Sequence, residues 1–482
     1  MPRKRHALWA MFAIAAAFLP IPLRAQFVYV TGCCDANSAG SILGYSVDSS
    51  GTLSSVSTLQ LTSAPSAIAV DTTGKFLFIG SVSHPSGAAS ISAYSIGSTG
   101  TLTPIGSPQA VSEILTLIAV DPLGNFIYGI GSHSVFAYSI DSTGALTPVG
   151  APQPTGALPE SIAVDATGSF VYVVNVSDST ISGYNIGPTG ALSSTGTPLT
   201  VANAVAIAAD PSGGFMYIAS KVPGPPPAVT FGQGDIAVYR IGSSGELTAD
   251  GAPVPNIVGL PVSLVVDPVG KSIYATGDST KGTSFLGFVS NYSITTAGSP
   301  VSIAAPAVQL FGGIGFGSAA VESGGKFFFA ATNVPGFGGA VSSYSIGSQG
   351  ALTMIGSPLP TNTSTATGLT VTPACKTAPT ITDVTAAPSV LWPPNGKMTN
   401  VAVNYNAAGQ CGTTACSLSI ASNEPVTGPG PDMTVVDAHD VELRAARLGN
   451  GTGRVYTITI ACTDTAGNSA QQNATVFVPH NQ

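Results

Sequence analysis

The stretch PESIAVDATGSFVYVVNVSDSTISGYNIGPTGAL, residues 159–192, decides the fold. Short runs of β-branched and aromatic residues alternate in it with turns that contain glycine, a pattern typical of consecutive β-strands. It predicts strands at Ile162–Asp165, Phe170–Val174 and Ile181–Ile186, and a fourth strand that begins at Ala191. No part of the stretch has a helical period. We therefore expect a four-stranded antiparallel unit.

The tyrosine of the third strand recurs along the chain and marks seven copies of this unit. Successive copies are 44 to 55 residues apart. A four-stranded unit at that period is typical of a propeller blade, and each blade needs two neighbours to bury both of its faces. The tyrosines are Tyr45, Tyr94, Tyr138, Tyr184, Tyr239, Tyr292 and Tyr344.

The two ends of the array complement each other. Phe27–Val30 reads as a second strand without a first, and Thr367–Thr372 reads as a first strand without a second. Unpaired edges at both ends would promote aggregation. We therefore expect the two segments to pair and close a ring of seven blades, with Val28 beside Leu369.

The N-terminal segment has the features of an export signal. Three basic residues, Arg3–Arg5, precede an apolar run from Ala7 to Leu23, and Ala25 is a small residue suited to signal-peptidase cleavage. The alternative is a retained membrane anchor, but the run is short for a span and contains two prolines. We predict a signal peptide at residues 1–25, no membrane insertion after cleavage, and a secreted or cell-surface protein.

Charge excludes one class of partner. Charged residues make up only 8 % of the chain, and the net charge is −8. Cleavage of the signal would remove four positive charges and give −12. Arg240 is the single arginine between residues 26 and 374. An acidic surface of this kind does not favour nucleic acid or anionic membranes.

An acidic residue recurs at the turn between the first and second strands, three positions before a glycine. A carboxylate there can accept hydrogen bonds from the backbone of its own turn. The alternative is a ring of metal-binding carboxylates, which we disfavour on the expectation that turns in separate blades point away from one another. The residues are Asp71, Asp121, Asp165, Asp210 and Asp267.

The variable connections, second to third strand and fourth to first strand, all emerge on one face of such a propeller, here called the long-loop face. Binding residues concentrate on loops of this kind. We select Glu113, His133 and Glu160 as candidate ligand-binding residues at the channel mouth, since each lies close to a first strand or in a short loop. The other reading is solvated loop charge. The face also carries Asp35, His84, Asp178, Lys221, Asp235, Asp278 and Lys281.

No nucleophile–base pair, metal-ligand spacing or phosphate-binding loop accompanies these residues. The sequence therefore predicts no metal, no cofactor and no assigned catalytic residue.

The motif P-x-x-I-A-V-D-x-x-G-x-F-x-Y-V-x-N at Pro159–Asn175, followed by I-x-x-Y-x-I-x-x-x-G-x-L, resembles the lactonase-type seven-bladed propeller and the related YVTN repeat. The resemblance extends over residues 26–374. It implies relatives among 6-phosphogluconolactonases and carboxymuconate-lactonising enzymes, whose sites use basic and acidic side chains around the channel. This chain departs from that pattern, with one arginine and two histidines in the ring.

Residues 375–482 form a second predicted domain of six or seven strands, which suits a β-sandwich. Leu391–Met398, Ser422–Val426 and Arg454–Asn468 resemble immunoglobulin-like modules related to HYR domains, which implies a spacer or adhesion unit. Calcium ligation by Asp437, Asp440, Asp464 and Asn468 is an alternative to turn capping. The predicted strands are Ile381–Ala386, Thr399–Asn404, Ser417–Ala421, Val441–Ala446, Arg454–Ala461 and Ala474–Val478.

Six cysteines in an exported chain indicate disulfides, and six allow 15 pairings. We prefer a bridge between the two sheets of the sandwich from Cys416 to Cys462. Cys375 would then pair with Cys411, and Cys33 with Cys34.

Two functions remain open. The first is a secreted, non-catalytic binding or surface protein that takes an extracellular glycan, peptide or protein on the long-loop face. The second is a lactonase-like hydrolase, related to 6-phosphogluconolactonases, that acts on a lactone. The enzyme would need Glu113, His133 or Glu160 to converge at the channel mouth.

Overall fold

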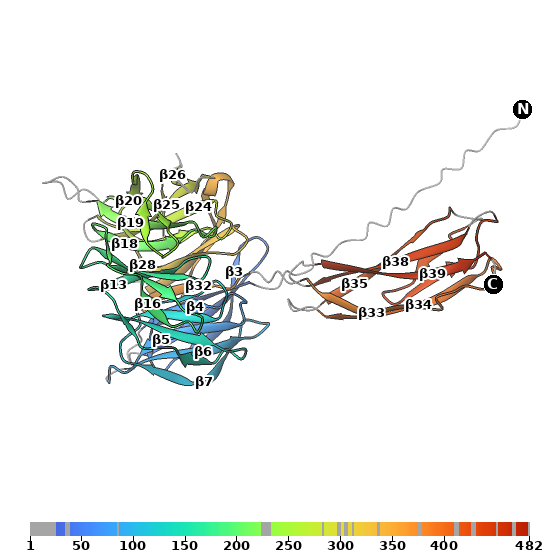
Figure 1. Ribbon diagram of the computed structural model, residues 1–482, viewed down its shortest axis with the longest axis horizontal. Helices are drawn as coiled ribbons and strands as arrows, with labels where there is room; N and C mark the ends of the chain where they lie inside the picture. The colour runs from blue at the N-terminus through green and yellow to red at the C-terminus, as the bar shows by residue number, and fades with distance from the viewer. Residues whose placement is uncertain are drawn as a thin grey trace, which may run out of the picture. The chain divides into compact units, whose positions relative to one another are not determined.

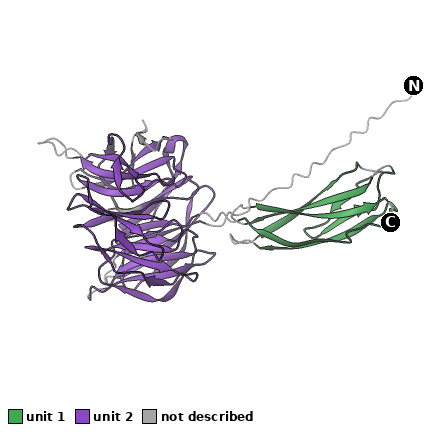
Figure 2. Ribbon diagram, in the orientation of Figure 1, with its two compact units in different colours: residues 1–24, 376–482 green, residues 25–375 purple. Residues whose placement is uncertain are grey.

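A computed structural model describes most of the chain from Gln26 to His480. The predicted signal peptide, Cys34, Asp35, His84, Cys375, Cys411 and Asn468 lie outside the described residues. The chain divides into two compact units, residues 25–375 and residues 376–482, the latter grouped with residues 1–24 (Figure 2). The described residues are 26–33, 39–83, 86–222, 233–281, 284–295, 300–302, 307–310, 313–334, 338–373, 378–408, 414–425, 430–449, 452–464 and 469–480.

The first unit is a propeller of seven antiparallel sheets (Figure 1). Six sheets form from strands consecutive in sequence, and the innermost strands contact one another around a complete ring. The predicted fold class, an all-β seven-bladed propeller, is confirmed. The innermost strands are β4 (Ala64–Val70), β8 (Leu117–Val120), β13 (Pro159–Val164), β18 (Ala204–Ala209), β23 (Leu260–Val266), β28 (Gly313–Val321) and β32 (Thr365–Val371).

The second and third strands of each blade follow the predicted repeat. The second strands are β5 (Phe76–Val82), β9 (Phe126–Ile130), β14 (Phe170–Asn175), β19 (Phe215–Val222), β24 (Ser272–Lys281), β29 (Phe327–Val334) and β1 (Gln26–Cys33). The third strands are β6 (Ala89–Ile96), β10 (Ser134–Ile140), β15 (Thr180–Ile186), β20 (Gln233–Ile241), β25 (Ser284–Ile294), β30 (Gly338–Ile346) and β2 (Gly40–Val47).

The fourth strands differ between blades. Three are continuous: β7 (Leu102–Val111), β31 (Leu352–Pro360), which follows the short 3₁₀ turn η1 (Ser348–Gly350), and β3 (Leu53–Gln60). In the other four blades the strand is split into two short pieces that pair with the same third strand. The pieces are β11 (Leu146–Pro148) and β12 (Gln153–Pro154), β16 (Leu192–Ser194) and β17 (Leu199–Thr200), β21 (Leu247–Ala249) and β22 (Val254–Val258), and β26 (Pro300–Ser302) and β27 (Val308–Gln309).

The closing blade joins the two ends of the propeller, as predicted. Its order is β3-β2-β1-β32, so three strands come from the N-terminal side and one from the C-terminal side. The predicted register was wrong by two residues: Val28 pairs with Val371, and Leu369 pairs with Val30. The observed register matches the hairpin of the third blade, where Val171 pairs with Val164.

Aromatic residues of the second strands hold neighbouring blades together. The hydroxyl of Tyr172 donates to the carbonyl of Gly245, in a turn of the next blade, at 2.9 Å. Tyr29 and Tyr274 make the same contact with Gly100 and Gly350. Each ring is fully buried, so it contributes both apolar area and a satisfied hydrogen bond. The repeat is therefore a packing device as well as a folding unit.

The second unit has two packed sheets. One has the order β33 (Thr380–Ala387), β34 (Met398–Ala408), β37 (Asp440–Arg444), β36 (Met433–Val435); the other has β35 (Thr414–Ser422), β38 (Gly453–Asp464), β39 (Ser469–Pro479). Side chains from both sheets form one core, among them Val401 and Leu443 of the first and Ile458 and Val476 of the second. Six strands were predicted, and only the short β36 was missed.

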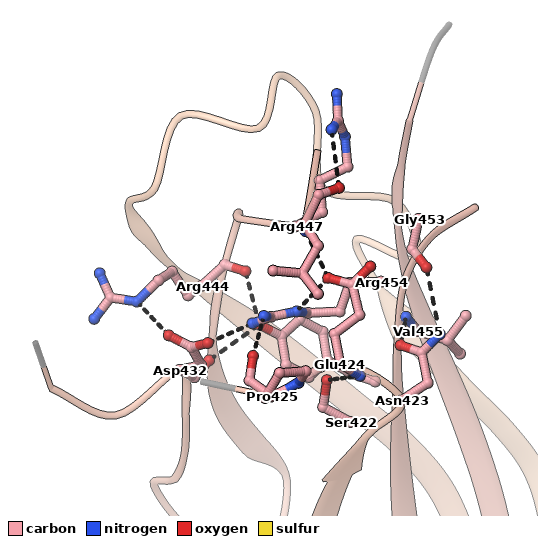
Figure 3. A network of polar contacts seen from close by, with 12 residues as sticks. Ser422, Asn423, Glu424, Pro425, Asp432, Arg444, Arg447, Gly453, Arg454 and Val455 are labelled. Atoms are coloured by element: carbon pink, nitrogen blue, oxygen red, sulfur yellow. Dashed lines mark hydrogen bonds and ion pairs between the residues drawn. The ribbon is translucent and has the colours of Figure 1, made fainter. Parts of the chain in front are cut away.

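A buried ion-pair network lies in this core (Figure 3). Arg454 is fully buried; its guanidinium lies 2.5 Å from a carboxylate oxygen of Asp432 and 3.4 Å from one of Glu424. It also donates to the carbonyl of Pro425 at 2.7 Å. Arg444 pairs with the second oxygen of Asp432 at 2.8 Å. A buried arginine needs all these partners, because an unpaired buried charge is strongly destabilising.

The predicted bridge from Cys416 to Cys462 is present, but its placement was wrong. Both residues lie in one sheet, directly opposite each other on β35 and β38, with their Cα atoms 4.0 Å apart. The bridge therefore ties neighbouring strands rather than the two sheets. Cys33 is also disulfide-bonded. The pairings proposed for Cys34, Cys375 and Cys411 stay predictions. In the described part of the chain, no helix is long and apolar enough to span a membrane.

Candidate functional site

In five blades a β-bulge leaves one residue of the innermost strand out of the regular ladder of pairs. In the third blade Pro159 pairs with Asn175 and Ser161 with Val174, which leaves Glu160 as the extra residue. Bulges re-aim side chains and are common next to active sites. Aligned by pairing, the same place, here called the bulge position, is taken by Ser66, Thr116, Val205, Val262 and Thr367 in other blades.

At two of the bulge positions, Ser66 and Thr367, the residue lines a cavity between innermost strands; Glu160, on β13, is not among the residues that line it. This cavity, of about 350 Å³, lies between β4, β8, β28 and β32. Small apolar side chains form the rest of the wall, including Ala67, Ala119 and Leu369. This part of the channel wall therefore presents mainly apolar side chains, with hydroxyl groups at Ser66, Thr72, Thr367 and Thr370.

Glu160 differs from the other described bulge residues because it alone is ionisable. Burial raises the pKa of its carboxyl above the usual value, and the positive charge of Lys221 opposes that shift. Lys221 belongs to β19 of the next blade, so blade packing brings the pair together. No described residue donates a hydrogen bond to the Glu160 carboxylate. A partly buried, unbonded carboxylate beside a cation has the properties of a general base.

Glu113 and His133 lie together in the second blade, with a structural role. One carboxylate oxygen of Glu113 accepts from the backbone N–H of His133 at 2.8 Å, and the other accepts from the Ser134 hydroxyl at 2.7 Å. The loop around Gly131 leaves no room for a Cβ against this carboxylate. Glu113 therefore caps the β9–β10 loop and is less available as a base. The His133 side chain is exposed. Among the described contacts, none joins either residue to Glu160.

The opposite face of the propeller, here called the turn face, carries the repeated carboxylates. Asp165 is 1 % exposed, and one of its oxygens accepts from the backbone N–H groups of Ser169 and Phe170, at 2.7 and 2.6 Å. Glu322, also buried, takes this role in the sixth blade, with bonds from Gly324 and Lys326. The residues with these turn contacts are Asp71, Asp121, Asp165, Asp267 and Glu322.

The expectation that these turns point apart was wrong. A Cβ placed on Gly325 would come within 2.8 Å of an Asp267 oxygen, and one on Gly168 would contact Leu123 at 3.6 Å and Asp121 at 3.8 Å. Each turn thus packs on the turn of the preceding blade. The carboxylates are nevertheless committed to backbone N–H groups, which explains their burial. The interpretation of these residues as turn supports accounts for the geometry.

Two other cavities lie off the channel. One of about 380 Å³ borders the closing blade and is lined by uncharged residues, including Ser41, Gln60 and Asn362. The other, about 460 Å³, lies between the third and fourth blades beside Tyr172 and Thr197, with Glu246 at its edge. Neither contains a pair of groups suited to acid–base chemistry. The channel mouth at Glu160 and Lys221 is therefore the candidate site.

Sequence reasoning selected Glu160 and treated Lys221 only as one charge among several. The proximity of Lys221 to Glu160 depends on how the third and fourth blades pack. The spacing of the two residues in the sequence does not predict it. Arg240, the arginine of the propeller, lies away from this site: it pairs with Asp250 at 2.8 Å and stacks over Phe215.

Comparison with known proteins gives the same fold. The family model described as lactonase, seven-bladed β-propeller, matches residues 27–130 and 118–209. No curated protein matches the sequence.

Solved structures resemble the propeller at low sequence identity. A proposed 6-phosphogluconolactonase from Bacteroides fragilis is 17 % identical, with a TM-score of 0.58, over 72 % of this chain and 98 % of that one. The periplasmic gluconolactonase PpgL of Pseudomonas aeruginosa is 14 % identical, with a TM-score of 0.56, over 72 % and 99 %. At these identities the likeness shows the fold alone. The family match extends over residues 27–209, part of the propeller, and agrees with the resemblance that the repeat predicts.

Proposed function

We propose that the protein is a lactone hydrolase whose reaction takes place at the channel mouth on the long-loop face. One observation carries the proposal: the partly buried Glu160 carboxylate occupies a bulge, and the positive charge of Lys221 in the next blade acts on it electrostatically. The family match favours this function over a non-catalytic one. The names of the neighbours, a proposed 6-phosphogluconolactonase and a gluconolactonase, point to the same class of reaction.

The pair supplies the groups that lactone hydrolysis needs. Glu160 takes a proton from water as the water oxygen adds to the lactone carbonyl. Lys221 stabilises the negative charge that develops on the carbonyl oxygen. When the ring C–O bond breaks, the protonated Glu160 returns the proton to the leaving alkoxide. Water and lactone give one hydroxy acid, and the enzyme ends in its starting state.

The test is hydrolysis of a panel of uncharged lactones by the full chain, followed in a pH-stat. Glu160→Gln keeps the size of the side chain and removes the base, so we expect a loss of about 10²- to 10⁴-fold in kcat/KM. Glu246→Gln is the matched control, because Glu246 is exposed on the turn face. Full activity of Glu160→Gln, or no turnover of any lactone, would contradict the proposal.

A second candidate is binding of an extracellular glycan, peptide or protein on the long-loop face. Exposed apolar side chains there favour it, since Val222 and Val258 are each more than a third exposed. Glycan, peptidoglycan and peptide arrays would test it. Binding retained by Glu160→Gln, with no lactone turned over by the parent chain, would favour this candidate over the first.

We further propose that the chain is exported, and that the C-terminal sandwich is an immunoglobulin-like spacer or adhesion unit. The basic and apolar N-terminal segment and the motifs of residues 391–468 support these proposals. N-terminal sequencing of the exported product would test the first, with Gln26 as the expected start. A product that retains residues 1–25 would contradict it.

A further inference from the structure

A second set of equivalent residues, one in each blade, lies near the channel mouth next to the bulge position. In each blade this position, here called the rim position, lies two residues before the bulge. Its described occupants include three large apolar residues that remain exposed: Ile114 at 40 %, Leu158 at 52 % and Leu260 at 43 %. Leu158 is two residues from Glu160 in sequence. An apolar surface therefore borders the candidate base.

Leu158 holds this place in an unfavourable backbone conformation. Its φ is +56°, in the left-handed region. The corresponding residue of the next blade is Asn203, at φ +54°, and asparagine adopts this conformation far more readily than leucine. Strained residues that persist often mark functional positions. The strained, exposed Leu158 lies two residues before Glu160 in the chain.

The channel wall formed by β28, β32, β4 and β8 is hollowed, but neither Leu158 nor Glu160 lines this cavity. The cavity of about 350 Å³ is lined mainly by alanine, valine, isoleucine and leucine. Ser66 and Thr367 add hydroxyl groups near the bulge level.

The same face is poor in cations. The long-loop face carries two lysines, Lys221 and Lys281, and the structure describes the side chain of the first; Lys75, Lys271 and Lys326 lie at turns of the opposite face. Recognition of a phosphate usually relies on several Arg or Lys donors. A phosphorylated sugar lactone is therefore a poor fit.

We propose that the substrate is a lactone with an uncharged alkyl substituent. Its carbonyl lies at Glu160 and Lys221, and its alkyl chain packs on Leu158 at the rim position. This inference rests on the proposed hydrolase function and specifies its substrate class.

The test compares γ-butyrolactone, γ-octalactone and γ-decalactone with glucono-δ-lactone and 6-phosphogluconolactone. We expect kcat/KM to rise about fourfold for each methylene that becomes buried. The γ-decalactone should therefore be cleaved fastest. A flat or falling series, or preference for either sugar lactone, would overturn the inference.

Leu158→Asn distinguishes contact between the rim position and the alkyl chain from a general effect on the fold. It should lower kcat/KM for γ-decalactone about fivefold and leave γ-butyrolactone nearly unchanged. Leu123→Asn is the matched control, because Leu123 is 67 % exposed on the turn face. Equal loss with both lactones, or an equal effect of the control, would contradict a role for Leu158 in chain recognition.

Binding to Glu160→Gln distinguishes failure of this inference from failure of the proposed function. By calorimetry, γ-decalactone should bind this variant more tightly than γ-butyrolactone even where turnover is abolished. Chain-dependent binding without turnover in the parent chain would contradict the hydrolase and keep the apolar site. Turnover with no chain dependence in rate or binding would contradict the apolar site and keep the hydrolase.

Discussion

Carboxylates on the two faces of the propeller illustrate how environment separates structural from chemical roles. On the turn face, Asp165 is buried and accepts several backbone hydrogen bonds from its own turn. On the long-loop face, Glu160 is partly buried, and the described residues give it a neighbouring cation but no hydrogen bond. A carboxylate with every lone pair engaged stabilises the fold, whereas one without such partners remains able to take a proton. The structural carboxylates recur at the same position of the repeat, whereas Glu160 is an acidic residue at a position where the other blades have uncharged ones.

The largest expected effect on stability lies on the turn face. Asp165→Ala leaves the N–H groups of Ser169 and Phe170 without their acceptor inside a packed turn. We expect the free energy of unfolding to fall by about 3 kcal/mol, from the cost of unsatisfied buried donors. Calorimetry of the full chain would measure this loss. Glu160→Ala is the comparison and should change stability little; an equal loss from both would remove the distinction between the faces.

The pH dependence of hydrolysis sharpens the comparison. Because burial raises the pKa of Glu160, its basic form is lost at a higher pH than for an exposed glutamate. Activity should fall about tenfold per pH unit below that pKa, with the acid limb of kcat/KM above the usual value of about 4.3. A limb at or below that value would contradict the assignment.

The raised pKa of Glu160 also affects how the free energy of unfolding depends on pH. The effect has the opposite sign to that of a salt-bridged carboxylate, whose pKa is lowered. Between the unfolded and folded pKa values of Glu160, the folded state binds more protons. Its contribution to stability therefore decreases as pH rises through that window. Glu160→Gln should remove this pH-dependent decrease, as measured by unfolding at a series of pH values.

Glu113 tests whether a carboxylate on the long-loop face can be structural. Glu113→Gln replaces a charged acceptor of the His133 N–H and the Ser134 hydroxyl with a neutral one. We expect a loss of about 1 kcal/mol in stability and a change in kcat/KM of less than about threefold. A loss comparable with that of Glu160→Gln would place Glu113 in the reaction instead.

The smallest expected effect comes from relief of strain. Leu158→Asn substitutes a residue that tolerates a positive φ, so the free energy of unfolding should rise by up to about 1 kcal/mol. Thermal unfolding of the variant would detect it. A destabilised Leu158→Asn would show that the leucine contributes packing that outweighs its backbone strain.

The repeat alone was enough to predict the blade, the number of blades and the closure by both chain ends. The closing register was missed because no turn connects β1 to β32, and turn length is what fixes register in a hairpin. The third blade has the same register, because its pair Val171–Val164 is equivalent to the pair Val28–Val371 of the closing blade. The split fourth strands were missed because their pieces are only two to five residues long.

Sequence selected Glu160 for its place before a first strand, but it could not separate Glu160 from Glu113. That distinction depends on the contact of Glu113 with the β9–β10 loop and on the position of Lys221 in another blade. Both arise from packing between segments distant in sequence. The disulfide shows the same limit: spacing suggested Cys416 with Cys462, and only strand pairing placed them within one sheet.

The most direct test of the contrast between the faces is a pair of isosteric changes, Glu160→Gln and Asp165→Asn, each measured for lactone turnover and for unfolding. The account predicts that the first abolishes turnover without lowering stability and that the second lowers stability while the folded fraction keeps its turnover. The reverse pattern, or loss of both properties in both variants, would contradict it.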